Sequence, residues 1–461
     1  MACDLLIKNG MVYINEGFEK LDVAVTGEKI SCLAKPGTIT EASRVVNAQD
    51  KHILPGMIDF HCHIREPGVE EKEDYESGTK AAANGGVTMV CPAPNGLFQS
   101  IANTGAYQKA VEAASKKAVV DFNPIASPLA FSEGEVQRLA DAGTAFFKIL
   151  EMNQKTPLKE SFGTADSYVL DQCFAAIAKV DMYCSIHPMD MSWYLGNVQS
   201  IQNKGGQLDL CHVLPQLYGD EEMSSAAWHL AYYIRKNKMK WYALHCWHDG
   251  YIDLVRMLKK QGDMNIIASV EIMPTNGMSD ELTDPKTGEK IPLGHTSMPN
   301  WKHIWEAVAD STIDILGSDH SPHLARHYHP ETPFQSAAGV PGLDWYGHLL
   351  LNEVNKGNLT LEKLVKLTSE NGAKAFGWYD RKGSNMPGTD ADFTICDLNR
   401  TWVVGGEKIY TKCGLSPYYG QTLKGKVTQT IVRGTVVMDE GEILVQPGYG
   451  RFIKPGKSLR L

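Results

Sequence analysis

Eight short apolar segments alternate with helix-like segments through the middle of this 461-residue chain. Helical patterns such as Ser77 to Ala83, Asn103 to Ala114, Glu222 to Arg235 and Leu361 to Phe376 recur in this region. Repeated strand and helix units predict a parallel sheet covered by helices, and eight such units predict a closed barrel. The apolar segments are Leu54 to Phe60, Val87 to Cys91, Ala118 to Phe122, Ala145 to Leu150, Met182 to Ile186, Lys240 to Leu244, Ile266 to Ile272 and Ile313 to Gly317.

A doubly wound open sheet is the structural alternative. It does not require eight evenly repeated units, and no Gly-x-Gly-x-x-Gly turn opens a helix in this sequence. The barrel is therefore the favoured interpretation.

The two ends of the chain have a different pattern of short strands separated by turn signals. Residues 1 to about 50 contain Leu5 to Ile7 and Val12 to Ile14, divided by Asn9-Gly10, and similar strands recur near the C-terminus. We predict an α/β fold with a (β/α)8 TIM-type barrel over residues 53–384. A small β-sandwich domain is assembled from both termini, residues 1–52 and 385–461.

Charge and apolar content narrow the classes of partner. The formal net charge is -9, and no stretch gathers Lys and Arg into the basic face that nucleic-acid binding needs. No apolar run is long enough to span a membrane, and the N-terminus lacks a signal-peptide pattern. The ten cysteines include no Cys-x-x-Cys pair, which suits a reducing compartment. We expect a cytoplasmic protein that binds neither nucleic acid nor a membrane.

Polar residues collect near the ends of the predicted barrel strands. The C-terminal ends of such strands meet at one face, where barrel active sites are built. One site can therefore gather all of these side chains. The residues are His61, His63, Asn95, Lys148, His187, His248, Asp319, His320 and His323.

The pair His61 and His63 has the two-residue period of a strand, so both imidazoles point to the same side and can bind one cation. Two histidines satisfied by backbone partners are the alternative. The presence of His187, His248 and Asp319 at other strand ends favours the metal site. Imidazole and carboxylate ligands without thiolate suit zinc, with manganese, cobalt or iron as alternatives.

Lys148 is a cation inside an otherwise apolar strand, where an unpaired ammonium is costly. A plain salt bridge is one explanation. The other is burial that lowers the pKa of the lysine, so that the neutral amine takes up carbon dioxide and forms a carbamate. The two oxygens of a carbamate can bridge two metal ions. Four neutral histidines and one aspartate would leave two divalent ions poorly neutralised, so the need for this added anion favours the carbamate.

The segments Pro55 to Gly68 and Gly317 to His323 resemble those of the cyclic amidohydrolases, the group of dihydroorotases, allantoinases and hydantoinases. The resemblance covers nearly the whole chain. It implies a barrel with a small β-sandwich and two divalent metal ions, with zinc favoured.

The resemblance also implies the residues of the metal site. His61, His63 and Asp319 hold the first ion, His187 and His248 hold the second, and carboxylated Lys148 and a hydroxide bridge them. The two cations acidify the bridging water so that it supplies this hydroxide. Asp319 takes the proton of the water and passes it to the leaving ring nitrogen.

Within this group, Arg65 and Asn95 are similar to the dihydroorotase residues that bind the substrate carboxylate. A guanidinium offers a planar fork that a carboxylate fills with two bonds. A salt bridge from Arg65 to Glu66 or Glu70 is the alternative. His323 either touches the substrate ring or has a supporting or surface role.

The function favoured by the resemblance is hydrolysis of a small cyclic amide, most like dihydroorotase. Allantoinase and hydantoinase or dihydropyrimidinase are the alternatives, since Val270 to Asn276 lacks the paired histidines common in dihydroorotases. A non-catalytic scaffold relative and an open-ring deaminase or phosphotriesterase-like hydrolase are more remote. The resemblance further implies a homo-oligomer, a dimer or tetramer. The aromatic-rich stretch from Pro188 to Asp220 forms either a lid or a surface helix pair or oligomer contact.

Overall fold

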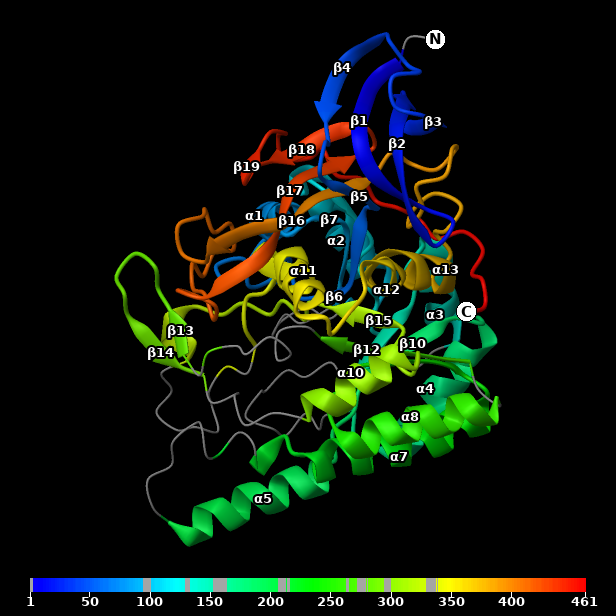
Figure 1. The fold of residues 1–461 in the computed structure, drawn as a ribbon. Coiled ribbons are helices and arrows are strands. Elements are labelled where there is room, and N and C mark those ends of the chain that lie inside the picture. The colour runs from blue at the N-terminus through cyan, green and yellow to red at the C-terminus, as the bar shows by residue number, and fades with distance from the viewer. Residues whose placement is uncertain are drawn as a thin grey trace.

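The structure is a computed structural model that describes residues 3–93, 101–128, 133–151, 164–205, 213, 216–262, 265–271, 279, 281–293, 300–328, 337 and 339–461. Strands from both ends of the chain form one sheet, which lies at the top of the view, and the helix-covered body lies below it (Figure 1). Among the described residues, no helix combines the length and apolar character needed to cross a membrane.

Eight parallel strands of the described chain form the predicted barrel. They are β6 (Met57–Cys62), β7 (Val87–Pro92), β8 (Asp121–Phe122), β9 (Phe147–Leu150), β10 (Tyr183–His187), β11 (Lys240–Ala243), β12 (Ile266–Glu271) and β15 (Ile315–Gly317). Strands β6 to β8 pair in one group and the other five pair in a second. Parallel bridges from Ala126 to Phe147 and from Cys62 to His320 join the two groups at both seams. The ring is therefore closed, and the predicted fold class is confirmed.

Helices follow most barrel strands, as the apolar periodicity predicted. The main ones are α1 (Tyr75–Asn84), α2 (Thr104–Lys117), α3 (Glu133–Ala142), α4 (Ser167–Lys179), α5 (Met191–Lys204), α7 (Asp220–Asn237), α8 (Asp249–Gln261), α10 (Trp301–Ala309), α11 (Tyr346–Lys356), α12 (Leu361–Val365) and α13 (Asn371–Ala375). Asn103, Asp166 and Asp190 begin three of them, because each side chain accepts hydrogen bonds from backbone amides of the first turn. Shorter elements are the hairpin β13 (Glu281–Thr283) and β14 (Lys290–Pro292), the 3-10 helices η1 (Ala325–His327) and η3 (Leu343–Trp345), and the π-helix η4 (Lys366–Glu370).

The sheet of the two ends contains nine strands of the described chain. They are β1 (Cys3–Ile14), β2 (Gly17–Thr26), β3 (Lys29–Ala34), β4 (Ala42–Asn47), β5 (His52–Pro55), β16 (Phe393–Val403), β17 (Thr422–Val432), β18 (Thr435–Asp439) and β19 (Glu442–Ile443). Strand β5 pairs with both β1 and β16 and so joins the two ends. Leu5 and Val25 share one buried cluster with Phe393 and Ile431. The boundaries at residues 52 and 385 stay predictions.

The first predicted barrel segment, Leu54 to Phe60, is divided between the two sheets. Leu54 belongs to β5 of the terminal sheet, and the barrel strand β6 begins only at Met57. Gly56 lies at the division, where a Cβ atom would come within 2.3 Å of Thr88 Oγ1. The barrel and the terminal sheet approach each other too closely there for any larger residue.

The predicted turn at Asn9-Gly10 is wrong, because β1 continues through it. Asn9 has a φ of 64°, and the pairing of β1 with β2 shifts register between Ile7 and Gly10. The Asn9 amide donates to Asp22 Oδ1 at 2.8 Å. Turn-forming residues therefore mark a β-bulge here, which bends the strand without ending it.

The stretch from Pro188 to Asp220 contains a surface helix. Helix α5 projects at the lower edge of the molecule (Figure 1). Met191 and Tyr194 are buried on its inner face, and Trp193 is 45% exposed. Residues 206–212 and 214–215 of the stretch lie outside the described residues. This geometry agrees with the surface-helix alternative, and the lid role stays a prediction.

Lys382 connects the barrel to the terminal sheet through buried charges. Its Nζ lies 2.6 Å from Asp121 of β8, 2.5 Å from Asp392 and 3.2 Å from Asp390. We expect Lys382→Met to lower the free energy of unfolding by about 3 to 5 kcal/mol, because it leaves the buried carboxylate of Asp392 without its cation and weakens the pairing of Asp121 and Asp390. Lys29→Met is the matched control: Lys29 also pairs with Asp390 but is half exposed, so its loss should cost less than about 1 kcal/mol. Urea denaturation measures both, and equal losses would contradict the assignment.

Candidate metal centre at the strand ends

His61 and His63 lie at the end of β6. The buried carboxylate of Asp59, two residues before His61, holds this strand end in place. Asp59 accepts hydrogen bonds from the His61 amide at 3.2 Å, the Ser318 amide at 3.1 Å and Ser318 Oγ at 2.5 Å. The backbone reinforces this link, because the Asp319 amide donates to the His61 carbonyl at 2.9 Å. The first and last barrel strands are thereby fixed in register at their C-terminal ends.

Asp319 is brought against both histidines by this register. Its Oδ1 lies 3.1 Å from His63 Nε2 and 3.6 Å from His61 Nε2. The backbone of Asp319 has a φ of 45°, in the left-handed region that non-glycine residues rarely adopt. Strained backbone of this kind clusters at functional sites, where the surrounding structure holds it in place.

His187 ends β10, and its ring lies 4.7 Å, centroid to centroid, from that of His245. The His245 ring lies at the same distance from that of His61. The sequence predicted His248 at this place, but the structure brings His245 to it. Strand β11 ends at Ala243, so His245, with a φ of 108°, projects toward the cluster. His248 instead begins helix α8, and its charged neighbours are Asp220, Asp249 and Glu221.

Lys148 lies within β9, and its Nζ is 3.5 Å from His61 Nε2. The side chain is buried, and burial lowers the pKa of Lys148 to about 8. Among the described residues, no carboxylate forms an ion pair with it, so the plain salt bridge has no partner in this part of the chain. The predicted position beside the histidines is therefore observed, and the carbamate stays a prediction.

Glu271 is a site residue that the sequence analysis did not identify. It ends β12 with no exposed surface, and its oxygens lie 3.6 Å from His61 Nδ1 and 3.1 Å from His245 Nδ1. Burial raises the pKa of Glu271 to about 8, and the nearby charge of Asp319 adds to the effect. An acidic residue at the end of an apolar barrel strand was the signal available in the sequence.

The electrostatics of the cluster favour neutral imidazoles. Burial lowers the pKa of His63 to about 4 and that of His245 to about 3, and it lowers the pKa of His61 and His187 well below the ordinary value. Burial alone would raise the pKa of Asp319, but the His63 hydrogen bond and the nearby charge of Lys148 oppose it, and the pKa lies well below its ordinary value, so the carboxylate is ionised. Neutral imidazole and ionised carboxylate are the forms that bind metal.

The donor set fits divalent metal ions on two observations. Ligand atoms of His61, His63 and Asp319 lie within 4.8 Å of one another, and so do those of His61, His245 and Glu271. In addition, His61 Nδ1, His245 Nδ1 and Glu271 Oε2 are buried and lack a hydrogen-bond partner among the described residues. Buried polar atoms without partners are costly, and a bound cation would satisfy such a cluster.

Arg65 follows the histidine pair and is also buried. Its NH2 group donates to Ser321 Oγ at 2.6 Å and lies 3.0 Å from His323 Nε2. The two carboxylates predicted as alternative salt-bridge partners of Arg65 have other contacts. Glu66 pairs with Lys117 at 2.6 Å, and Glu70 accepts a hydrogen bond from the Gly68 amide. The structure therefore brings Arg65 and His323 together, as the substrate-contact prediction requires. The third predicted contact, Asn95, lies outside the described residues.

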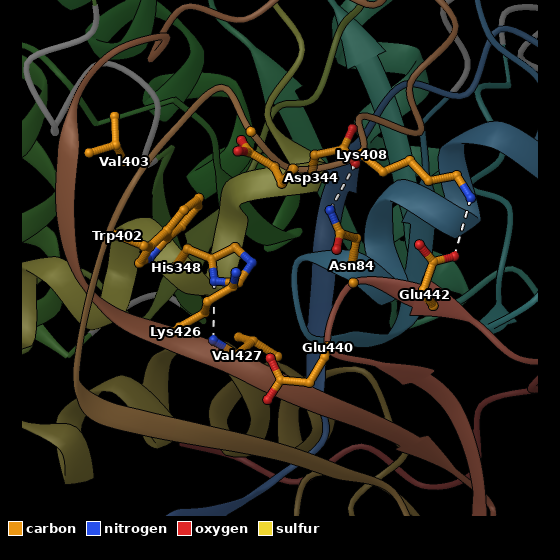
Figure 2. Close-up of a pocket in the computed structure, with 13 residues that line it drawn as sticks. Asn84, Asp344, His348, Trp402, Val403, Lys408, Lys426, Val427, Glu440 and Glu442 are labelled. Carbon is orange, nitrogen blue, oxygen red and sulfur yellow. Dashed lines mark hydrogen bonds and ion pairs between the residues drawn. The ribbon is translucent and has the colours of Figure 1, made fainter.

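A separate cavity of about 330 Å³ lies where the terminal sheet meets α1 and α11 (Figure 2). Its buried polar groups are paired with one another: Asn84 Nδ2 donates to Asp344 Oδ1 at 3.2 Å, and the Val427 amide donates to His348 Nδ1 at 3.1 Å. Burial lowers the pKa of His348 to about 3, so the ring stays neutral. The unsatisfied donors and acceptors of the strand-end cluster make that cluster the stronger candidate for chemistry.

Comparison with known proteins gives one family. The chain matches the amidohydrolase family over residues 52–437. It is 27% identical over 456 residues to the L-hydantoinase of Paenarthrobacter aurescens, which covers 98% of each chain. It is 29% identical over 407 residues to the dihydroorotase of Methanosphaera stadtmanae, covering 87% of this chain and 89% of that one. The allantoinase of Salmonella choleraesuis is 26% identical over 461 residues, covering 98% and 99%.

The fold has a solved counterpart. The structure of the L-hydantoinase (dihydropyrimidinase) from Arthrobacter aurescens superposes with a TM-score of 0.87 at 24% identity, over 98% of this chain and 100% of that chain. This similarity establishes a shared barrel and terminal sheet.

Asp59 provides a test of how the cluster is held. We expect Asp59→Ala to lower the free energy of unfolding by about 3 kcal/mol, because buried donors of His61 and Ser318 lose a charged acceptor. Ser318→Ala removes a single donor and should cost about 1 kcal/mol. Urea denaturation compares the two variants. A wild-type unfolding midpoint for Asp59→Ala would show that the carboxylate does not hold these strands together.

Proposed function

The chain belongs to the amidohydrolase family, and on that premise we propose that it hydrolyses the carbon–nitrogen bond of a small cyclic amide. One observation carries the proposal: four neutral imidazoles, a buried lysine and an ionised aspartate converge at the carboxyl ends of the barrel strands. The family relatives with named activities act on rings of this kind, as hydantoinase, dihydroorotase and allantoinase.

The proposed ligand set uses the corrected histidine. His61, His63 and Asp319 would hold one divalent ion, His187 and His245 a second, and a carbamate on Lys148 would complete the pair. Zinc suits these ligands. When bound, the two ions supply an acidified water and polarise the amide carbonyl. Glu271, whose oxygens face Nδ1 of both His61 and His245, would be a further ligand of an ion bound by these two rings.

Proton transfer falls to Asp319. Its carboxylate, ionised and 3.1 Å from His63 Nε2, would accept the proton of the attacking water. The same carboxyl group then returns the proton to the ring nitrogen as the carbon–nitrogen bond breaks. The closed barrel fixes Asp319 against the histidines before the substrate arrives, so little reorganisation is needed.

Within the family we favour a ring that carries a carboxylate, as in dihydroorotate. Arg65 supports this choice, since a buried guanidinium beside His323 and Ser321 offers the planar donor pair that a carboxylate fills. A hydantoinase or dihydropyrimidinase is the second candidate, supported by the L-hydantoinase relative that spans 98% of this chain.

Turnover of the metal-loaded protein on dihydroorotate, allantoin, dihydrouracil and substituted hydantoins tests the proposal. We expect dihydroorotate to be hydrolysed and Arg65→Ala to lower its kcat/KM by about 100-fold, because a bidentate charged contact is lost. If no cyclic amide is hydrolysed, the proposed function is wrong. If another cyclic amide is hydrolysed but dihydroorotate is not, only the choice of substrate is wrong. If Arg65→Ala hydrolyses dihydroorotate as fast as the wild type, the contact of Arg65 with the carboxylate is wrong.

His245 and His248 form a matched pair of histidines three residues apart. We expect His245→Asn to lower bound metal by one ion per chain and kcat by more than about 100-fold, since even changes around a ligand cost 10 to 100-fold. His248→Asn should keep both metals and kcat within about threefold of the wild type, because among the described residues His248 is not part of the grouped ligand atoms. Elemental analysis and turnover measure both effects. The reverse pattern would restore His248 to the ligand set.

A further inference from the structure

Lys72 reaches the same region as Arg65 from the segment between β6 and α1. Its side chain is buried, and its Nζ lies 3.2 Å from His323 Nδ1. Arg65 NH2 lies 3.0 Å from the other ring nitrogen, Nε2. The His323 ring is therefore held between two cationic side chains, close to the histidine pair of β6.

This arrangement has too many hydrogen-bond donors. A guanidinium and an ammonium donate only, and a neutral imidazole has one acceptor nitrogen, its other nitrogen being a donor. One of the two contacts to His323 is therefore donor against donor. A protonated ring would have no acceptor at all. If the ring accepts from Arg65, its other nitrogen carries the proton and faces the ammonium of Lys72, so Lys72 requires an additional acceptor.

The neighbouring carboxylates do not supply it. Lys72 forms no ion pair with a carboxylate among the described residues, although six acidic residues lie within six positions of it in the sequence. Glu66 pairs with Lys117, Glu73 with His320, and Asp74 with Lys412. Burial lowers the pKa of Lys72 to about 8, and the charge of Arg65 adds to the effect. The charge of Glu71 opposes this shift, but among the described residues the buried ammonium has no carboxylate within ion-pair distance.

We propose that Lys72 binds the carboxylate of the substrate together with Arg65 and His323, and that it selects anionic cyclic amides over neutral ones. A carboxylate supplies two acceptor oxygens, enough to take hydrogen bonds from the ammonium, the guanidinium and the free imidazole N–H. Ser321 fixes the Arg65 fork through its hydroxyl at 2.6 Å. The site lies beside the reaction centre, since Arg65 is two residues from His63. This inference rests on the proposed function and deepens it.

Dihydroorotate and dihydrouracil form a matched pair of substrates, because they share one ring and differ by the carboxylate. With metal-loaded enzyme, we expect Lys72→Met to lower the ratio of kcat/KM for dihydroorotate to that for dihydrouracil by about 10 to 100-fold, the loss of one charge-assisted contact. The change should fall mainly on the KM for dihydroorotate. Lys72→Arg keeps the charge and should hold the ratio within about threefold of the wild type.

Two further variants separate selectivity from folding. Lys72→Gln is a second neutral replacement should Lys72→Met fail to fold, and thermal unfolding of each variant identifies that case. Lys116→Met removes an exposed lysine of α2 and should leave the ratio at the wild-type value. A purely structural role for Lys72 would lower kcat/KM for both substrates equally, and that result would overturn the proposal.

The failure of this inference differs from the failure of the proposed function. If the enzyme hydrolyses dihydrouracil but not dihydroorotate, the function stands and the role of Lys72 is wrong. If it hydrolyses neither ring nor any other cyclic amide, the proposed function fails. Calorimetry with orotate and uracil then still tests Lys72: weaker orotate binding by Lys72→Gln, with uracil binding unaltered, supports the anion site, and equal orotate binding overturns it.

Discussion

The carboxylate of Asp59 is the constraint on which the candidate site depends. It accepts hydrogen bonds from the His61 amide and from both donors of Ser318, and so joins the first barrel strand to the last. Because this junction also closes the barrel, the position of Asp319 against His61 and His63 follows from closure itself. A functional geometry that needs precision is thereby placed on rigid strand ends and not on a loop.

Two kinds of buried polar groups surround this junction. On one side, neutral imidazoles and Glu271 offer electron pairs to a cation, and on the other, Arg65 and Lys72 offer donors to an anion. Burial strengthens both effects, since a low-dielectric interior makes unpaired polar groups costly. A substrate whose amide meets the metals and whose carboxylate meets the cations would satisfy both at once.

Most of the fold could be predicted because its signals are local. Val87 to Cys91 and Lys240 to Leu244 are apolar runs of strand length, and they form β7 and β11 nearly residue for residue. Where prediction failed, a contact distant in sequence decided the outcome. Gly56 divides a continuous apolar run because Thr88 and Asp392 approach it, and Asn9-Gly10 forms a bulge because β1 stays paired with β2 on both sides.

The sequence by itself determined the chemistry of the site: imidazole, carboxylate and amine side chains at strand ends, with His61 and His63 on one face through the two-residue period. Only the tertiary structure decided which groups converge. Two histidines three residues apart follow β11, and the left-handed backbone of His245 turns that ring inward while His248 lies at the N-terminus of α8. Lys72 and Glu271 reach the site across the fold, and sequence spacing carries no information about contacts made between separate strands and loops.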